Sequence, residues 1–137
     1  MNAISRVTIA LSLALLGAAS ATAQTGHDLF QQALVKERAD GDLRGAIAIY
    51  ERIVDEFTSD RALTAKSLVQ MGQCYEKLGS TEAERAYRRV VREFQDQNDL
   101  VVRAQSRLAA LQRAARAEED VRLTTHQVWS GPTAGAH

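Results

Sequence analysis

The sequence predicts an all-α fold, a short α-solenoid of about two and a half helix-turn-helix repeats behind an N-terminal leader. The first observation is internal repetition, because Ala46, Tyr50 and Ile53 recur as alanine, tyrosine and valine 37 residues later. The second is that apolar residues after residue 26 follow the three- and four-residue spacing of amphipathic helices. The third is that the single proline, Pro132, lies outside these patterns. Repeated helical hairpins present extended surfaces, so this organisation indicates binding rather than catalysis.

The first 23 residues have the features of a Sec-type signal peptide. Arg6 precedes an uncharged stretch over residues 7–19, and the small residues 21–23, Ala-Thr-Ala, form a cleavage site before Gln24. The stretch is shorter than the ~20 residues that span a membrane, and bacterial lipoproteins resemble one another in carrying a cysteine where Gln24 stands. We expect cleavage after Ala23, no stable membrane insertion afterwards, and a periplasmic or secreted protein. A membrane-tethered adaptor with an uncleaved leader is the alternative.

The first predicted unit contains two helices. One runs from about residue 27 to 39, with an apolar stripe at Leu29, Phe30, Ala33 and Leu34, and stops at the turn 40–42, Asp-Gly-Asp. The other covers about residues 43–57. Its apolar side, which we expect to pack on the first helix, consists of Leu43, Ala46, Ile47, Tyr50, Ile53, Val54 and Phe57.

The second predicted unit repeats this arrangement. Its first helix follows Thr58 and Ser59, which we expect to cap the free N–H groups, and ends at Gly79. Its second helix starts from Ser80, with Thr81 as a second possible cap three residues before a glutamate. The apolar residues of the two helices are Ala62, Ala65, Leu68, Val69, Met71, Gly72 and Tyr75, then Ala83, Ala86, Tyr87, Val90, Val91 and Phe94.

A fifth helix is predicted over about residues 98–116. It has one apolar face, formed by Val101, Ala104, Leu108 and Leu111, and no fully matching partner helix after it. We therefore expect it to cap the array with a polar outer face. The chain then divides into a signal peptide (1–23), a helical domain (27–116) and a linker or tail (117–137).

The second unit resembles a tetratricopeptide repeat. Residues at that family's packing positions are Leu68, Gly72, Tyr75, Ala83, Tyr87 and Val90. The first unit is looser, with Glu37 where the family usually has tyrosine. The resemblance covers about residues 29–111 and implies a non-enzymatic module that binds proteins or peptides.

A more specific resemblance concerns the chain as a whole. The segments 49–54, 71–79 and 86–94 look like the module of exported bacterial proteins in which such repeats precede a TolB-like, WD40-type β-propeller. In those proteins a segment like 127–132, Gln-Val-Trp-Ser-Gly-Pro, marks entry into the first propeller strands. This implies an alternative function, a structural spacer of a larger protein with no independent activity. Val128 and Trp129 would then begin a strand whose partner is absent, and the other interpretation is a disordered tail.

Composition and motifs argue against an enzyme. The chain has 17 basic and 17 acidic residues, so no strong net charge draws it to nucleic acid or membrane. The three histidines, His27, His126 and His137, do not share a helix at metal-ligand spacing, and the carboxylates fall on solvated helix faces. We expect no metal, no cofactor and no catalytic residues.

The single cysteine, Cys74, could form an intermolecular disulfide or act as a redox handle in an exported protein. Its place between Met71 and Tyr75 favours a third role, because a free cysteine among packing residues behaves as a small apolar side chain. We expect Cys74 to be buried.

Two surfaces are candidates for binding a protein partner of the cell envelope. The first is the inner groove, formed by the first helix of each unit, with Gln31, Val35, Arg38, Lys66, Val69, Gln73 and Lys77. Such a polar, mildly basic groove suits an extended or acidic peptide. The second is a basic stripe on the fourth helix, Arg85, Arg88, Arg89 and Arg92, for which an ordinary solvated face is the alternative. Nothing in the sequence indicates nucleic-acid binding, a particular partner or an oligomeric state.

Overall fold

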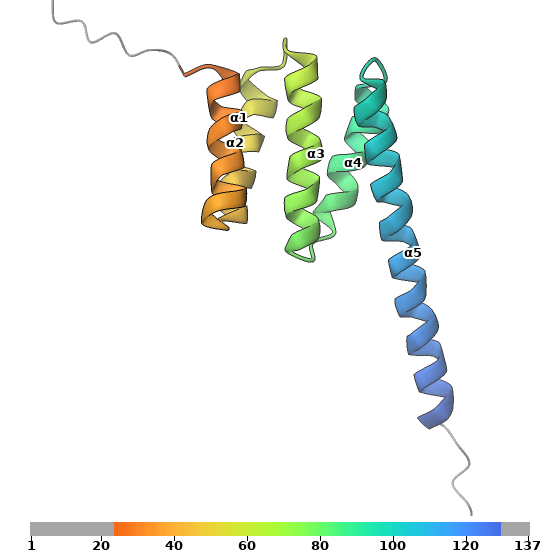
Figure 1. Ribbon diagram of the computed structural model, residues 1–137. Helices are drawn as coiled ribbons and strands as arrows, with labels where there is room; N and C mark the ends of the chain where they lie inside the picture. The colour runs from red at the N-terminus through yellow and green to blue at the C-terminus, as the bar shows by residue number, and fades with distance from the viewer. Residues whose placement is uncertain (1–23, 130–137) are drawn as a thin grey trace, which may run out of the picture.

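The computed structural model describes residues 24–129 and confirms the all-α solenoid. The elements are α1 (Gly26–Val35), η1 (Lys36–Asp40), α2 (Leu43–Glu56), α3 (Arg61–Lys77), α4 (Glu82–Glu93) and α5 (Asn98–Trp129). Figure 1 shows α1, α3 and the first part of α5 side by side in one layer, with α2 and α4 in a second layer behind them. The predicted signal peptide lies outside the described residues. None of the helices in residues 24–129 is long and apolar enough to cross a membrane.

The first helix has the predicted extent, but its last turn has a different geometry. Thr25 and Asp28 form a capping box at its start, so α1 begins at Gly26. Helical structure continues to Asp40, close to the expected end near residue 39, and residues 36–40 form a π-helical turn, η1. This wider turn coincides with the burial of Glu37. Gly41 closes it in the left-handed conformation, with φ of 68°.

Of the predicted helix caps, Thr58 or Ser59 for α3 and Thr81 for α4 are wrong, whereas Ser80 for α4 is confirmed. Asp60, rather than Thr58 or Ser59, caps α3, since its side chain accepts a hydrogen bond from the N–H of Leu63 at 3.0 Å. At the start of α4 the side chain of Thr81 makes no capping bond. The backbone N–H of Glu82 donates instead to the Ser80 hydroxyl at 3.3 Å. The predicted stop at Gly79 is confirmed, with φ of 65°.

The apolar residues form two core clusters that meet at α3. The first lies among α1, α2 and α3 and consists of Leu29, Phe30, Ala33, Ala46, Ile47, Tyr50, Ile53, Leu63 and Cys74. The second lies among α2, α3, α4 and α5 and consists of Val54, Ala65, Leu68, Val69, Ala83, Tyr87, Val90, Phe94 and Ala104. Because α3 contributes to both, each hairpin packs its apolar face on the next one.

A hydrogen-bonded link joins each hairpin to the next helix. In the first, the Tyr50 hydroxyl donates to Glu37 at 3.2 Å, and Lys77 Nζ lies 2.7 Å from the same carboxylate. Only 4% of the Glu37 side chain is exposed, so the carboxylate depends on these partners. We call this arrangement the tyrosine–glutamate–cation link; it joins α2, η1 and α3.

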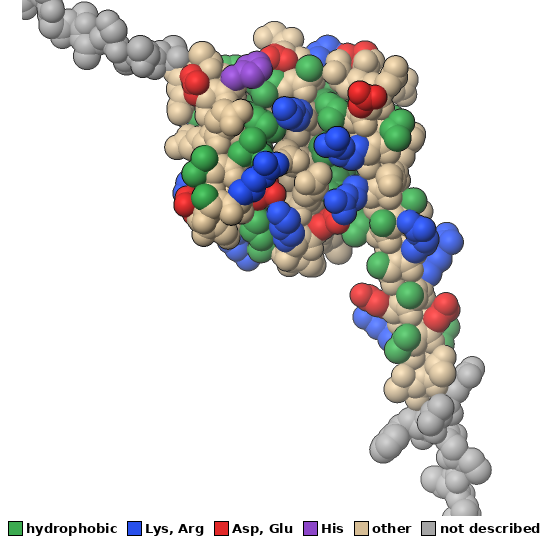
Figure 2. All heavy atoms as spheres, viewed as in Figure 1, with side chains coloured by type: hydrophobic (Ala, Val, Ile, Leu, Met, Phe, Trp, Pro, Cys, Tyr) green, Lys and Arg blue, Asp and Glu red, His purple; other side chains and the backbone are tan. Residues whose placement is uncertain are grey.

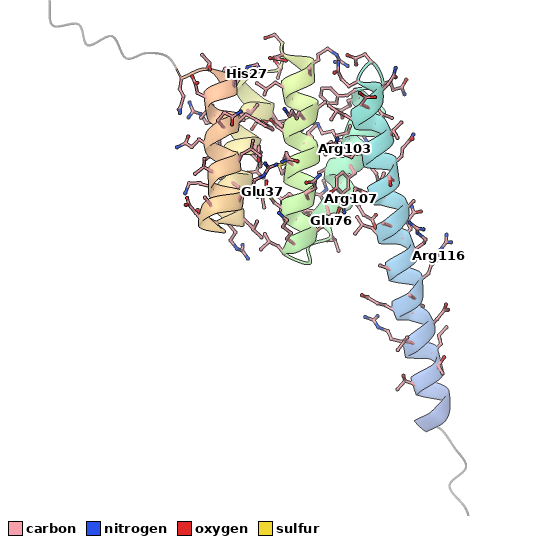
Figure 3. The ribbon with its side chains drawn as sticks, in the orientation of Figure 1. His27, Glu37, Glu76, Arg103, Arg107 and Arg116 are labelled. Carbon is pink, nitrogen blue, oxygen red and sulfur yellow. The ribbon has the colours of Figure 1, made fainter. Side chains whose placement is uncertain are left out.

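The link recurs in the second unit. The Tyr87 hydroxyl donates to Glu76 at 2.5 Å, and Arg107 lies 3.4 Å from the other Glu76 oxygen. This second link joins α4, α3 and α5, and Figure 3 labels Glu37, Glu76 and Arg107. Burial and the neighbouring carboxylate raise the pKa of both Tyr50 and Tyr87, so both phenols remain hydrogen-bond donors near neutral pH.

Cys74 lies inside the first core cluster, as the sequence predicts, and is fully buried. Burial, and then the charge of Glu37, raise the pKa of its thiol to about 12. A thiol held in its neutral form is a weak nucleophile, so the environment of Cys74 fits a packing role.

The last helix is much longer than predicted. α5 continues through Trp129, past the expected end near Arg116, so Val128 and Trp129 lie in a helix and not in a strand. Residues 130–137, the rest of the predicted tail, lie outside the described residues. Figure 1 shows the second half of α5 extending beyond the other helices.

Gly72 is required by the close packing of α3 on α4. A Cβ atom at Gly72 would lie 2.6 Å from the Tyr87 ring, closer than side chains approach one another. We expect Gly72→Ala to lower the free energy of unfolding by about 1–3 kcal/mol through overpacking, even though alanine favours a helix by about 1 kcal/mol. Urea unfolding measures the change. Gln73→Ala, at a half-buried position of the same helix that forms no side-chain hydrogen bond among the described residues, is the control and should change stability by less than about 0.5 kcal/mol.

The first tyrosine–glutamate–cation link gives a second prediction. We expect Glu37→Ala to lower the free energy of unfolding by about 1–3 kcal/mol, because the buried Tyr50 hydroxyl loses its acceptor. The matched control is Glu51→Ala, since Glu51 accepts a similar hydrogen bond from Tyr75 at 3.1 Å on the exposed surface. Thermal unfolding followed by circular dichroism compares the two variants; equal losses would show that burial of the link contributes nothing.

Candidate protein-binding groove

A groove runs along the layer formed by α1, α3 and the start of α5. Its volume is about 780 Å³, and it is open to solvent. Figure 2 shows several Lys and Arg side chains spread over this side of the molecule. The lining residues are Phe30, Gln31, Leu34, Arg38, Lys66, Val69, Gln70, Asp96, Gln97, Asn98, Asp99, Leu100 and Arg103.

Four of the seven residues predicted for this groove line it. Gln31 and Arg38 come from α1 and η1, and Lys66 and Val69 come from α3. Val69 is only 1% exposed and belongs to the second core cluster, so it forms part of the apolar floor and offers a ligand little surface. Gln31, Arg38 and Lys66 are exposed.

The other three predicted residues do not line the groove. Val35 is 55% exposed, but it lies outside the lining set. Gln73 is half-buried, and Lys77 is engaged by Glu37 in the first tyrosine–glutamate–cation link. Lys77 lies in the last turn of α3, which faces the carboxylate of η1 and not the groove.

The third wall of the groove was not predicted from the sequence. This wall is the turn before α5 and the first turns of α5, including Asp96, Asp99 and Arg103. From the sequence we expected this helix only to cap the array. When it is aligned instead as the first helix of a third unit, its register places Arg103 on the groove side. The internal repeat of the sequence could therefore have predicted this position of Arg103.

Arg61 fixes this third wall against α3. Its guanidinium forms a two-atom ion pair with Asp96, donates to the backbone carbonyl of Glu93 at 2.7 Å, and lies 5.0 Å from the centre of the Phe94 ring. The hydrogen bonds from Arg61, with a further one from Gln97, hold the pKa of the Asp96 carboxyl well below its usual range. The negative charge of Asp96 is therefore already matched by Arg61.

Three cations in the groove remain without an ion-pair partner. Within residues 24–129, Arg38, Lys66 and Arg103 form no salt bridge. The Lys66 ammonium instead lies 4.8 Å from the centre of the Phe30 ring, a cation–π contact that holds it over the groove. Asp99 is the one acidic lining residue that has no salt bridge among the described residues, so the groove carries a surplus of positive charge.

The basic stripe on α4 has a different environment. Arg85 pairs with Glu82 at 2.8 Å and Arg88 with Glu84 at 2.6 Å, while Arg89 and Arg92 share Glu93 at 2.9 and 2.6 Å. These pairs lie within one helix and offset most of the charge. The contacts therefore fit an ordinary solvated helix face.

The described residues contain no cluster of three or more His, Cys, Asp or Glu side chains that could hold a metal ion. The buried groups whose pKa is shifted furthest are two tyrosines and one cysteine, Tyr50, Tyr87 and Cys74, and each has a structural partner. The arrangement at the groove can hold a ligand by charge, hydrogen bonds and apolar contact.

Comparison with known proteins agrees with this architecture. Neither a search of curated proteins nor a search of solved structures gave a match. Two segments match the family model described as tetratricopeptide repeat, over residues 29–59 and 66–96. The first segment covers most of α1, η1 and α2, and the second covers most of α3 and all of α4. The two matched segments are therefore similar to tetratricopeptide repeats, a type of repeat that forms modules for protein–protein interaction.

Proposed function

We propose that this protein is an exported tetratricopeptide-repeat adaptor that binds an extended, acidic segment of a partner protein in the groove between α1, α3 and α5. The observation that carries the proposal is the set of three groove cations, Arg38, Lys66 and Arg103, that have no ion pair within the described residues. An acidic ligand would supply the missing partners, and it would do so without breaking an existing ion pair.

The shape of the groove supports an extended ligand. The three cations come from three different elements, η1, α3 and α5, so a ligand that contacts all of them must cross the layer. Gln31 and Asn98 are exposed and add side-chain amides that can hydrogen-bond to a peptide backbone. Phe30 and Leu34 provide apolar surface between the polar groups. Several weak contacts of this kind give a modest affinity that falls as salt is added.

The cell envelope is the proposed site of action. Residues 1–23 have a positive residue, an apolar stretch and a small-residue cleavage site, which supports export and removal of the leader after Ala23. An exported adaptor would meet acidic segments of other envelope proteins.

The alternative is a spacer within a larger protein of the propeller-containing kind. The observation that favours it is the length of α5, which continues well beyond the packed hairpins to Trp129. A long helix can hold the repeat module at a fixed distance from another domain. In that case the groove would be an ordinary solvated surface.

The groove predicts that the triple variant Arg38→Ala, Lys66→Ala, Arg103→Ala loses acidic ligands. Selection on the wild-type protein from a random peptide library should enrich sequences rich in Asp and Glu. The triple variant should bind the enriched peptides about tenfold more weakly or worse in fluorescence anisotropy, since three charge contacts are removed at up to about 1 kcal/mol each.

The control for this experiment is a second triple variant, Arg85→Ala, Arg88→Ala, Arg92→Ala. It removes the same number of positive charges from α4, where each arginine is already paired. Binding of the enriched peptides should change by less than about threefold, because these charges are already offset within their helix. If both triple variants lost the same affinity, the loss would be explained by net charge and not by the groove. Enrichment of peptides without acidic residues would contradict the proposed ligand.

The intact mass of the endogenous protein tests export and the spacer alternative together. We expect an envelope fraction to contain a species lighter than the 15.0 kDa chain by the mass of residues 1–23. Mass spectrometry of the purified species measures this. The unprocessed mass would contradict cleavage after Ala23, and a much heavier species containing these helices would favour the spacer.

A further inference from the structure

The second half of α5 is a solvent-exposed helix. From residue 112 to residue 125 every side chain is exposed, because the packed face of the helix ends at Leu111. Figure 3 labels Arg116 on this part of the helix, beyond the packed hairpins. Among the exposed residues are two large apolar side chains, Val121 at 65% and Leu123 at 56% exposure. An isolated helix of this kind gains little stability without a partner.

One face of this segment has the spacing of a coiled-coil seam. Ala110, Ala114, Ala117, Val121 and Thr124 follow one another at intervals of four, three, four and three residues. All five are exposed, and a shallow hollow beside Ala117 and Val121 lies on the same face. The Thr124 hydroxyl donates to the Asp120 carbonyl at 2.8 Å, so its polar group is satisfied within its own helix. This face can therefore pack against another helix without leaving a buried polar group unpaired.

We infer that the occupant of this face is the same face of a second copy of the chain, in antiparallel orientation. The charges along the segment are self-complementary: Arg113 and Arg116 precede Glu119 and Asp120. None of these four side chains forms a salt bridge within the described residues, in contrast to the paired charges of α4. Reversing the direction of one helix brings the basic part of each copy to the acidic part of the other.

The seam and the charges select one register. When Ala114 of one copy lies opposite Ala117 of the other, Arg113 and Asp120 flank the seam on the same side and pair across it in both directions. Val121 then lies opposite Ala110, which places a larger side chain against a small one. About 12 residues of each helix, 110–121, then lie opposite the seam of the other copy, a length of about 18 Å.

The neighbouring arrangements carry repulsive contacts. A shift of one heptad in one direction places the two Asp120 side chains of the dimer opposite each other. A shift in the other direction places the two Arg113 side chains opposite each other. In a parallel pair the seam continues toward the hairpins through Arg103 and Arg107, which would each face their own copies. Like charges at these positions disfavour the alternatives and leave the antiparallel register.

Sedimentation velocity tests this inference. The sample is the purified protein, expressed from the full sequence including residues 1–23. We expect the wild-type protein to shift from monomer toward dimer as its concentration rises. Arg113→Asp should weaken this dimer roughly tenfold or more, because two attractive pairs become repulsive. The double variant Arg113→Asp, Asp120→Arg should restore it, because the exchanged charges meet again in the antiparallel register.

The double variant also distinguishes the orientation. In a parallel pair Arg113 would face Glu118, so the double variant would set two carboxylates against each other there and would remain monomeric. Circular dichroism of each variant serves as the folding control, since Arg113 and Asp120 are exposed in the monomer. A wild-type protein that stays monomeric at all concentrations, or a double variant that fails to dimerise while folded, would overturn the inference.

Discussion

The architecture depends on a buried carboxylate that ties successive helices together. Glu37 lies in the interior with 4% of its side chain exposed, and it is held by Tyr50 from the same hairpin and by Lys77 from the next one. A buried carboxylate without these donors would be costly, so the link orients all three helices at once. The same chemistry at Glu76 continues the link to α5. Each hairpin is thereby positioned relative to its neighbour by a directional contact in addition to apolar packing.

The links also decide which cations are available for binding. Lys77 and Arg107 serve the carboxylates of the links, and the arginines of α4 serve the glutamates of their own helix. Three of the cations without such an ion pair in the described residues, Arg38, Lys66 and Arg103, line one groove. A ligand there would meet positive charge that the fold itself does not use. This distinction comes from pairing and not from the number of basic residues, since the α4 stripe has more of them.

Much of the fold could be predicted from the sequence because the governing interactions are local. The helical period located the five helices, and the residues around Cys74 indicated its burial. Caps were harder to assign, because Thr58, Ser59 and Asp60 are all good capping residues and only the chain path decides that Asp60 caps α3. The end of α5 was missed because its second half has no packed face, and a buried stripe was the signal for a helix.

The sequence by itself determined the all-α class, the two repeated hairpins and the helix order, because spacing along the chain fixes which side of each helix is apolar. Only the tertiary structure decided which charged residues form ion pairs within the fold and which remain unpaired. Lys77 is as basic as Lys66, yet one lies against Glu37 and the other lies over the groove. Such pairings join residues distant in the chain, Glu37 to Lys77 and Arg61 to Asp96, so no local pattern contains them. Packing of the hairpins brings those partners together, and the proposed binding groove contains three cations that this packing leaves unpaired.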